Sequence, residues 1–311
     1  MGRVRFLRIV ALPGLLMLGL AVVRPAGAQE VGTELITLRT SDGVELAAAV
    51  HAPAGPPPRV AVVSVHGYAG NFYTGVQGHL PKALARAGYL VVVPNMRDHG
   101  RGPKTTPFEA NRLDIAAAVD EAARRIRGAV ILHGQSMGSN RASYYLAETA
   151  DPRVRALVLT APPGGLFEWN VRVFGREAAQ RTLEDAQRRL AEGRGQELMV
   201  VDLGPLGKAL YSAEHLVSLR GPGTRSDPYR NLAAARVPVL IVQGTGDSLV
   251  DWQGVPERLR ASARAAPRVD VVMIDGADHA FSRHRDELAA AVTGWLRGVL
   301  GSPREGQGSG D

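Results

Sequence analysis

Six short apolar runs constrain the fold of this chain more than any other feature of its sequence. They cover residues 60–65, 89–93, 129–133, 156–159, 237–242 and 269–274. Each run is rich in valine, isoleucine or leucine and is followed by proline, glycine or polar residues. Such runs are typical of strands that are buried on both faces of a sheet. Stretches with helical spacing lie between several of them, at residues 79–87, 112–126 and 141–149. This alternation predicts an α/β fold, with a mostly parallel sheet and helices on both faces.

Two further strands are predicted before the first buried run. Residues 33–39 alternate in polarity and residues 44–51 are expected to form a second strand. The turn residues Ser41, Asp42 and Gly43 lie between them, which favours a β-hairpin. The hairpin and the six buried runs together predict eight strands. A helix over residues 286–299 closes this part of the chain.

One long segment, residues 162–235, contains no convincing buried strand. The spacing of apolar residues predicts helices over residues 177–191 and 206–219, and several aromatic side chains lie around them. We expect this segment to be an insertion that forms a cap or lid over the end of the sheet. The alternative is a helical excursion on the surface. The core would then consist of residues 29–161 and 236–300, followed by a disordered, glycine-rich tail at 301–311.

The first 28 residues differ from the rest of the chain. Three arginines in the first eight residues precede an uncharged apolar run over residues 9–23, and three small residues follow at 26–28. This pattern predicts a secretory signal peptide over residues 1–28, and therefore a periplasmic or secreted protein with no stable membrane anchor. The alternative is a retained anchor, but the run is short for a span of about 20 residues and Pro13 interrupts it.

Composition excludes several classes of function. The net charge of +7 includes four arginines in residues 1–28 and no acid there, so the chain without this segment carries only +3, which does not favour nucleic-acid binding. The chain has no cysteine, which excludes disulfides, thiolate metal sites and a cysteine nucleophile. Neither a cofactor-binding motif nor a metal-ligand motif is evident, so we expect neither group. The oligomeric state stays open.

The strongest motif is Gly134-Gln135-Ser136-Met137-Gly138, which directly follows an apolar run and precedes a helical stretch. This order of strand, serine turn and helix is typical of a nucleophile elbow, in which the turn presents the serine hydroxyl at the end of a sheet. The motif alone is weak, because a chain with 36 glycines can contain it by chance. Its context favours Ser136 as a nucleophile.

A serine nucleophile needs a base, and histidine suits that role near neutral pH. Of eight histidines, His279 directly follows the last buried run, where the histidine of a Ser–Asp–His triad belongs in chain order. Asp247, in a glycine-rich turn after the run 237–242, is the expected acid, and Asp251 is its rival. The alternatives are a solvated loop histidine and a turn-forming aspartate.

An oxyanion intermediate needs two backbone donors. The expected donors are the N–H of Met137, which follows the nucleophile, and the N–H of Tyr68, in the loop after the first buried run. His66, just before Tyr68, is expected to pack under that loop and not to act as a base. The aromatic residues expected to line the substrate pocket are Phe72, Tyr73, Phe167 and Trp169.

These motifs together resemble the α/β-hydrolase superfamily over residues 33–300. The matching segments are Val63 to Gly67, Arg97 to Gly100, Gly134 to Gly138, Gly244 with Asp247, and Gly276 to His279. The resemblance implies an eight-stranded sheet whose second strand is antiparallel. The most similar branch is the monoacylglycerol lipase and serine aminopeptidase type, which has a helical cap where residues 162–235 lie. Gln135 departs from that pattern, since histidine is frequent before the serine.

The pattern and the resemblance point to a serine hydrolase that cleaves a carboxylic ester of a small molecule through an acyl-enzyme. Amide or peptide hydrolysis and acyl transfer use the same residues and stay open. A non-catalytic binding protein on the same fold is a further alternative, although it would not need all three residues of a triad.

Overall fold

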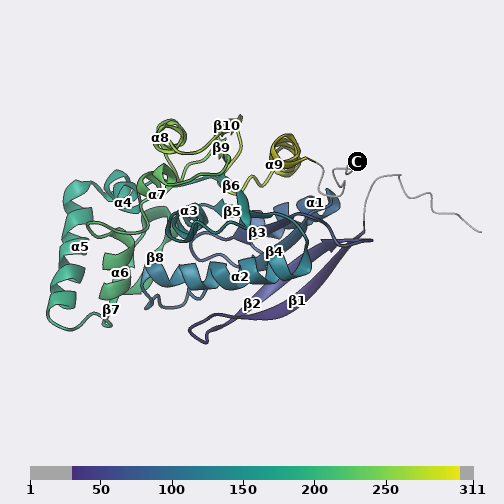
Figure 1. Ribbon diagram of the computed structural model, residues 1–311. Coiled ribbons are helices and arrows are strands. Elements are labelled where there is room, and N and C mark those ends of the chain that lie inside the picture. Colours follow the sequence, from purple (N-terminus) through teal and green to yellow (C-terminus); the bar gives the residue numbers. More distant parts are fainter. Residues whose placement is uncertain (1–29, 302–311) are drawn as a thin grey trace, which may run out of the picture.

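The computed structural model describes residues 30–301, and eight strands in this range form one sheet (Figure 1). In spatial order they are β1 (Val31–Arg39), β2 (Glu45–Pro53), β4 (Leu90–Pro94), β3 (Ala61–Val65), β5 (Val130–Gln135), β6 (Val154–Thr160), β9 (Val239–Gly244) and β10 (Val269–Ile274). β2 runs antiparallel to both of its neighbours, and all other neighbouring pairs are parallel. The predicted α/β fold, with its antiparallel second strand, is confirmed. The predicted signal peptide, and the predicted tail beyond residue 301, lie outside the described residues.

Helices cover both faces of this sheet. One face carries α1 (Leu80–Arg86) and α9 (Arg285–Leu300), and the other carries α2 (Asn111–Arg125), α3 (Met137–Thr149), α7 (Pro228–Ala233) and α8 (Val255–Ser262). Alternate residues of a strand serve the two faces, so Val62 packs with the first set and Val63 with the second. This explains why the sequence runs are apolar throughout. No helix within residues 30–301 is long and apolar enough to cross a bilayer.

β10 differs from its prediction as a strand buried on both faces. It lies at the edge of the sheet and pairs only with β9. Most of its residues are only half-buried, and Met273 is 42% exposed. An edge strand lacks a neighbour on one side, and its apolar sequence does not reveal this.

A second group of elements lies beyond one end of the sheet, at the left of Figure 1. It consists of α4 (Leu166–Phe174), α5 (Arg176–Ala191), β7 (Leu198–Asp202), β8 (Lys208–Ser212) and α6 (Ala213–Arg220), and we call residues 166–220 the cap segment. Short 3₁₀ turns occur at Gly75–Gly78, Phe108–Ala110 and Gly204–Leu206. α7 follows the cap segment but packs on the sheet, where its Leu232 is fully buried. The part of residues 162–235 that stands apart from the sheet therefore ends before α7.

The helix predicted over residues 206–219 is wrong in its first half. Residues 208–212 form β8, which pairs antiparallel with β7, and only residues 213–220 form a helix. Ala209 and Tyr211 are buried whereas Lys208 and Leu210 are exposed, which is the two-residue period of a strand. β8 passes directly into α6 without a proline or glycine between them, so the two elements are easily mistaken for one helix.

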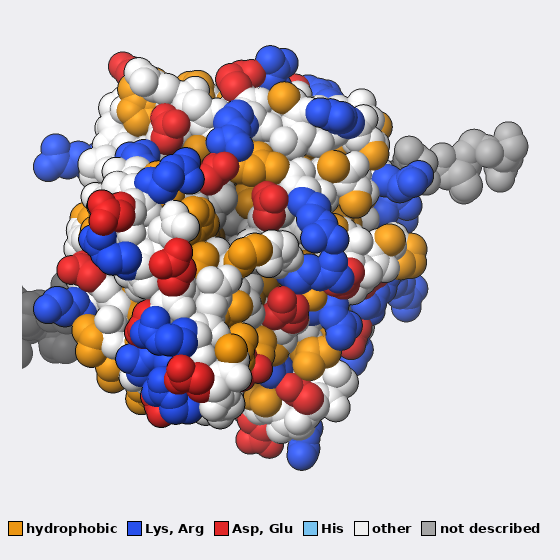
Figure 2. Space-filling model, turned by 90° about the vertical axis from the view of Figure 1, so that its left-hand side faces the viewer, with side chains coloured by type: hydrophobic (Ala, Val, Ile, Leu, Met, Phe, Trp, Pro, Cys, Tyr) orange, Lys and Arg blue, Asp and Glu red, His pale blue; other side chains and the backbone are white. Residues whose placement is uncertain are grey.

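Hydrogen bonds on two sides connect the cap segment to the rest of the molecule. Lys104, in a loop after β4, donates its N–H to Leu210 O at 2.8 Å and accepts from Ser212 N–H at 2.8 Å. On the other side, Trp169 of α4 donates its indole N–H to Leu249 O at 2.7 Å. Figure 2 shows the outer face of this region, with a hollow near its centre that hydrophobic side chains border.

Candidate active site

Ser136 lies in a strained turn between β5 and α3. Its φ of 52° and ψ of −128° are unusual for a residue with a side chain and cost about 1–3 kcal/mol. The turn is held because Ser136 donates its N–H to Thr160 O on the adjacent strand at 2.9 Å. A Cβ on Gly138 would lie 2.3 Å from Val65 O, so only glycine permits this close packing of α3 on the end of β3. The turn leaves Ser136 partly exposed.

His279 and Asp247 form a hydrogen-bonded pair. His279 Nδ1 lies 2.7 Å from Asp247 Oδ2. An ionised carboxylate only accepts, so Nδ1 carries the hydrogen and donates it, and Nε2 is the nitrogen available to accept a proton. The side chain of Asp247 is fully buried, whereas that of His279 is 20% exposed. Asp247 is therefore shielded from solvent, whereas His279 is accessible from the cavity side.

The Asp247 carboxylate accepts further hydrogen bonds that fix its position. Oδ2 also accepts from Gln243 Nε2 at 3.1 Å, and Oδ1 accepts from the N–H of Leu249 at 2.8 Å and of Val250 at 3.3 Å. These donors compensate the buried negative charge, since an isolated carboxylate would be costly to bury. They come from β9 and from the loop after it, so the chain on both sides of Asp247 orients it.

The loops after β9 and β10 are packed together closely enough to bring Asp247 and His279 into contact. A Cβ on Gly244 would lie 2.1 Å from Ala277 O, so glycine is required there. Gly246 N–H donates to Ala277 O at 3.0 Å. Thr245 Oγ1 donates to Asp275 at 2.8 Å and accepts from the N–H of Gly276 at 2.7 Å. The adjacent positions of β9 and β10 and these hydrogen bonds between their loops bring Asp247 and His279 into contact.

Asp251 has a different environment. Its carboxylate is exposed and accepts from the N–H of Gln253 at 3.2 Å and of Gly254 at 3.1 Å. It thus closes a turn just before α8, and within residues 30–301 it has no hydrogen bond to His279. Of the two aspartates considered from the sequence, only Asp247 contacts the histidine.

Tyr68 and Met137, the expected oxyanion donors, line the same cavity as Ser136. Neither backbone N–H donates to an acceptor in the described part of the chain. His66 lies under this loop, as predicted: it accepts from Met96 N–H at 3.0 Å and donates through Nδ1 to Gly67 O at 2.8 Å. Burial lowers the pKa of His66 to about 3, so it is neutral and serves as a structural support.

Sequence reasoning missed a buried ion pair beneath this loop. Arg141 of α3 binds both carboxylate oxygens of Asp98, at 2.7 and 2.6 Å, and donates to His66 O at 2.9 Å. Burial alone would raise the pKa of Asp98, but the charge of Arg141 holds it at about 2. Asp98 lies in one of the segments that resemble the α/β-hydrolase superfamily, and its place in Arg97-Asp98-His99-Gly100 was the available signal. Its partner could not be identified without the fold.

A cavity of about 130 Å³ opens above Ser136, and we call it the nucleophile cavity. It is lined by Tyr68, Gln135, Ser136, Met137, Pro163, Leu166, Trp169, Leu203, Leu206, Arg220, Leu249, Val250 and His279. It thus brings together the candidate nucleophile Ser136, His279 and both oxyanion candidates under side chains of the cap segment. Within residues 30–301 no group of three or more His, Cys, Asp or Glu side chains is arranged to hold a metal ion.

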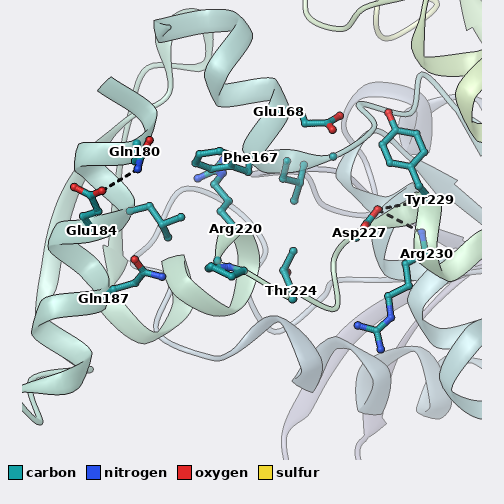
Figure 3. A pocket seen from close by; sticks show the side chains of 16 residues that line it. Phe167, Glu168, Gln180, Glu184, Gln187, Arg220, Thr224, Asp227, Tyr229 and Arg230 are labelled. Atoms are coloured by element: carbon teal, nitrogen blue, oxygen red, sulfur yellow. Dashed lines mark hydrogen bonds between the residues drawn. The ribbon is translucent and has the colours of Figure 1, made fainter. Parts of the chain in front are cut away.

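Of the four predicted pocket residues, only Trp169 lines the nucleophile cavity. Tyr73 is 66% exposed and contacts Phe72, which packs partly against the α1–α9 face of the core. Phe167 lines a larger cavity of about 520 Å³ between α4, α5 and α6, the cap cavity (Figure 3). The predictions for Phe72, Tyr73 and Phe167 are therefore wrong for the nucleophile cavity. Leucines of the cap segment and the loop after β9 take their place, and nothing in the sequence distinguishes these from core leucines.

Comparison with known proteins identifies the family. A sequence model described as the alpha/beta hydrolase family matches residues 62–291, well over half of the chain. No curated protein matches the sequence. Among solved structures, Est1E from Butyrivibrio proteoclasticus is similar, with 19% identity, a TM-score of 0.62, and coverage of 86% of this chain and 98% of that chain. A second structure of Est1E contains bound ferulic acid.

Two structures named as esterases are also similar. Esterase Pf2001 from Pyrococcus furiosus has 18% identity and a TM-score of 0.61, covering 88% of this chain and 92% of that chain. The esterase domain of a Rhodothermus marinus protein has 21% identity and a TM-score of 0.59, covering 86% of this chain and 98% of that chain. At such identities the similarity establishes the shared fold, and the chemistry must be argued from the residues.

Proposed function

We propose that this chain, which belongs to the alpha/beta hydrolase family, is a serine hydrolase that cleaves carboxylic esters with Ser136, His279 and Asp247 as its triad. The observation that carries the proposal is the 2.7 Å hydrogen bond between His279 and Asp247 at the wall of the cavity that Ser136 also lines. A nucleophile, a base and an acid that orients the base are the parts that this chemistry needs.

In the first half of the reaction, Ser136 Oγ attacks the ester carbonyl carbon while His279 Nε2 takes the hydroxyl proton. The carbonyl oxygen becomes an oxyanion, which accepts hydrogen bonds from the N–H groups of Tyr68 and Met137. Asp247 holds the tautomer of His279 and stabilises the imidazolium. The C–O bond to the alcohol then breaks, His279 returns the proton to the leaving oxygen, and an acyl-enzyme remains.

In the second half, water takes the place of the alcohol. His279 Nε2 removes a proton from the water as its oxygen attacks the acyl carbon, and the same N–H groups hold the second oxyanion. The bond to Ser136 Oγ breaks and the proton passes to that oxygen. The products are the carboxylic acid and the free enzyme.

Two features support an ester as the substrate class. The nucleophile cavity is narrow and mainly apolar, so it suits a small acyl or alcohol group. Among the structural neighbours, two are named as esterases and one carries ferulic acid, a carboxylic acid. Membership of the monoacylglycerol lipase and serine aminopeptidase branch stays a prediction.

A fluorophosphonate probe, which reacts with activated serines, tests the proposal directly. We expect the wild-type protein to be labelled, and the Ser136→Ala variant to be unlabelled and to lose about 10⁵-fold or more in kcat on p-nitrophenyl esters. p-Nitroanilides of the same acids measure amide cleavage, and added alcohols measure acyl transfer. A wild-type protein that is neither labelled nor active on any ester would refute the proposal.

A further inference from the structure

Arg220, the last residue of α6, is a buried cation without a counter-charge. It is only 6% exposed, and its Nε and Nη1 atoms have no hydrogen-bond acceptor within residues 30–301. Its guanidinium carbon lies 5.7 Å from the centre of the Tyr211 ring. Burial lowers the pKa of Arg220, and the groups that oppose this are Tyr211 and Tyr68; no carboxylate of the described chain takes part. Arginine keeps its charge in proteins, so Arg220 is a buried cation whose Nε and Nη1 donors are unused within residues 30–301.

Such an arrangement is costly for the folded protein. Burying a charged group without a partner is unfavourable, and a cation–π contact offsets only part of that cost. Arg141 shows the usual solution in this molecule, since both of its carboxylate bonds go to Asp98. A costly group that persists without a structural partner is a candidate for ligand binding.

The position of Arg220 indicates where that ligand lies. Arg220 lines both the nucleophile cavity and the cap cavity, so it forms part of the wall between them. Figure 3 shows its side chain running from α6 towards α4, where Phe167 lies. No aspartate or glutamate is among the described residues that line the nucleophile cavity, and Arg220 is the one permanently charged side chain there. An anion that enters the nucleophile cavity meets no carboxylate in its described lining, whereas the cap cavity on the other side of Arg220 is also lined by Glu168, Glu184 and Asp227.

We propose that Arg220 binds a carboxylate group of the substrate, so that the preferred substrate is an ester that carries a free carboxylate. The planar guanidinium suits bidentate binding of a carboxylate, either side-on through Nε and Nη2 or end-on through Nη1 and Nη2, so that one of the unused donors would gain an acceptor. The ester carbonyl would lie at Ser136 while the carboxylate reaches Arg220 from within the nucleophile cavity, away from the carboxylates that line the cap cavity. This inference rests on the esterase function proposed above and adds a substrate class to it.

The test compares charged and uncharged esters of equal length. Mono-p-nitrophenyl esters of adipic, suberic and sebacic acid carry the carboxylate on the acyl side, and their ω-methyl esters are the neutral counterparts. For the alcohol side, the butyrate ester of 4-hydroxybenzoic acid is compared with that of methyl 4-hydroxybenzoate. We expect the wild-type protein to prefer the charged member of at least one pair by about 10- to 100-fold in kcat/KM, mainly through a lower KM.

Three variants separate binding from structure. Arg220→Met keeps the length of the side chain but removes the charge, and we expect it to abolish the preference. Arg220→Lys keeps the charge but not the planar fork, and should retain part of the preference. Arg181→Met is the matched control, because Arg181 lies on α5, pairs with Glu177 and lines neither cavity. It should keep the full preference.

The outcomes are distinguishable from failure of the esterase proposal. If the wild-type protein reacts with the fluorophosphonate probe and cleaves neutral esters but shows no charged preference in any pair, the role of Arg220 is refuted and the esterase function stands. If Arg220→Met lowers kcat/KM for charged and neutral esters by the same factor, Arg220 is structural and the inference also fails. Labelling of each variant by the probe verifies that its active site is folded.

Discussion

Two buried arginines occupy the two regions of the molecule, and their surroundings differ. Arg141, beneath the active-site edge of the sheet, binds the carboxylate of Asp98 and a backbone carbonyl. Arg220, in the cap segment, has a tyrosine ring beside it, and no carboxylate within residues 30–301 pairs with it. The same contrast holds more widely, since the sheet edge also pairs Asp247 with His279. The sheet edge thus satisfies its buried charges internally and is built before substrate binds, whereas the cap segment holds a charge that a ligand can satisfy.

The largest expected effect follows from removing a charge partner at the sheet edge. We predict that Asp247→Asn lowers kcat by about 10⁴-fold, because an amide can donate to Nδ1 and favour the wrong tautomer of His279. Asp251→Asn is the control and should change kcat less than about twofold, since Asp251 only closes a turn. Steady-state kinetics on a p-nitrophenyl ester measures both. A larger loss for Asp251→Asn would reverse the assignment of the triad acid.

Replacing each arginine in turn compares how much Arg141 and Arg220 contribute to the free energy of unfolding. Arg141→Met leaves the Asp98 carboxylate buried without a cation, so we predict that the free energy of unfolding falls by about 3–5 kcal/mol. Arg220→Met leaves no carboxylate unpaired, and the lost contact with the Tyr211 ring costs about 2 kcal/mol at most. Urea denaturation of both variants provides the measurement. Equal losses would show that Arg220 is a structural residue like Arg141.

The smallest effect concerns the neutral histidines under the sheet edge. Burial lowers the pKa of His133, like that of His66, to about 3. The unfolded chain binds these protons near pH 6.5 and the folded chain does not, so stability is full above pH 6.5 and falls as the pH drops towards 3. Each such histidine contributes about 1.4 kcal/mol per pH unit within this window.

The variant His133→Gln tests this dependence. It removes one titrating group, so we predict that the fall in the free energy of unfolding between pH 6 and pH 5 becomes smaller by about 1.4 kcal/mol. Urea denaturation at the two pH values measures this difference, which is independent of any uniform loss from the hydrogen bonds of His133 to Ser64 and Thr160. An unchanged difference would mean that His133 is protonated in the folded protein.

Much of the fold could be predicted because its signals are local. The apolar runs locate the strands, since a strand in a covered parallel sheet must be apolar on both sides. Local patterns failed where the outcome depends on distant neighbours. β10 has the sequence of a central strand but lies at an edge, and the sequence of β8 favours a helix although its pairing with β7 makes it a strand.

The candidate site divides in the same way. The elbow sequence by itself determined where Ser136 lies and why glycine flanks it, because a tight turn between strand and helix imposes steric limits on adjacent residues. The chain order further favoured His279 and Asp247. The tertiary structure alone decided which aspartate contacts the histidine, which side chains close the cavity, and that Arg220 is buried there without a counter-charge. Those facts depend on contacts between segments far apart in the chain, and no local pattern in a single sequence records such contacts.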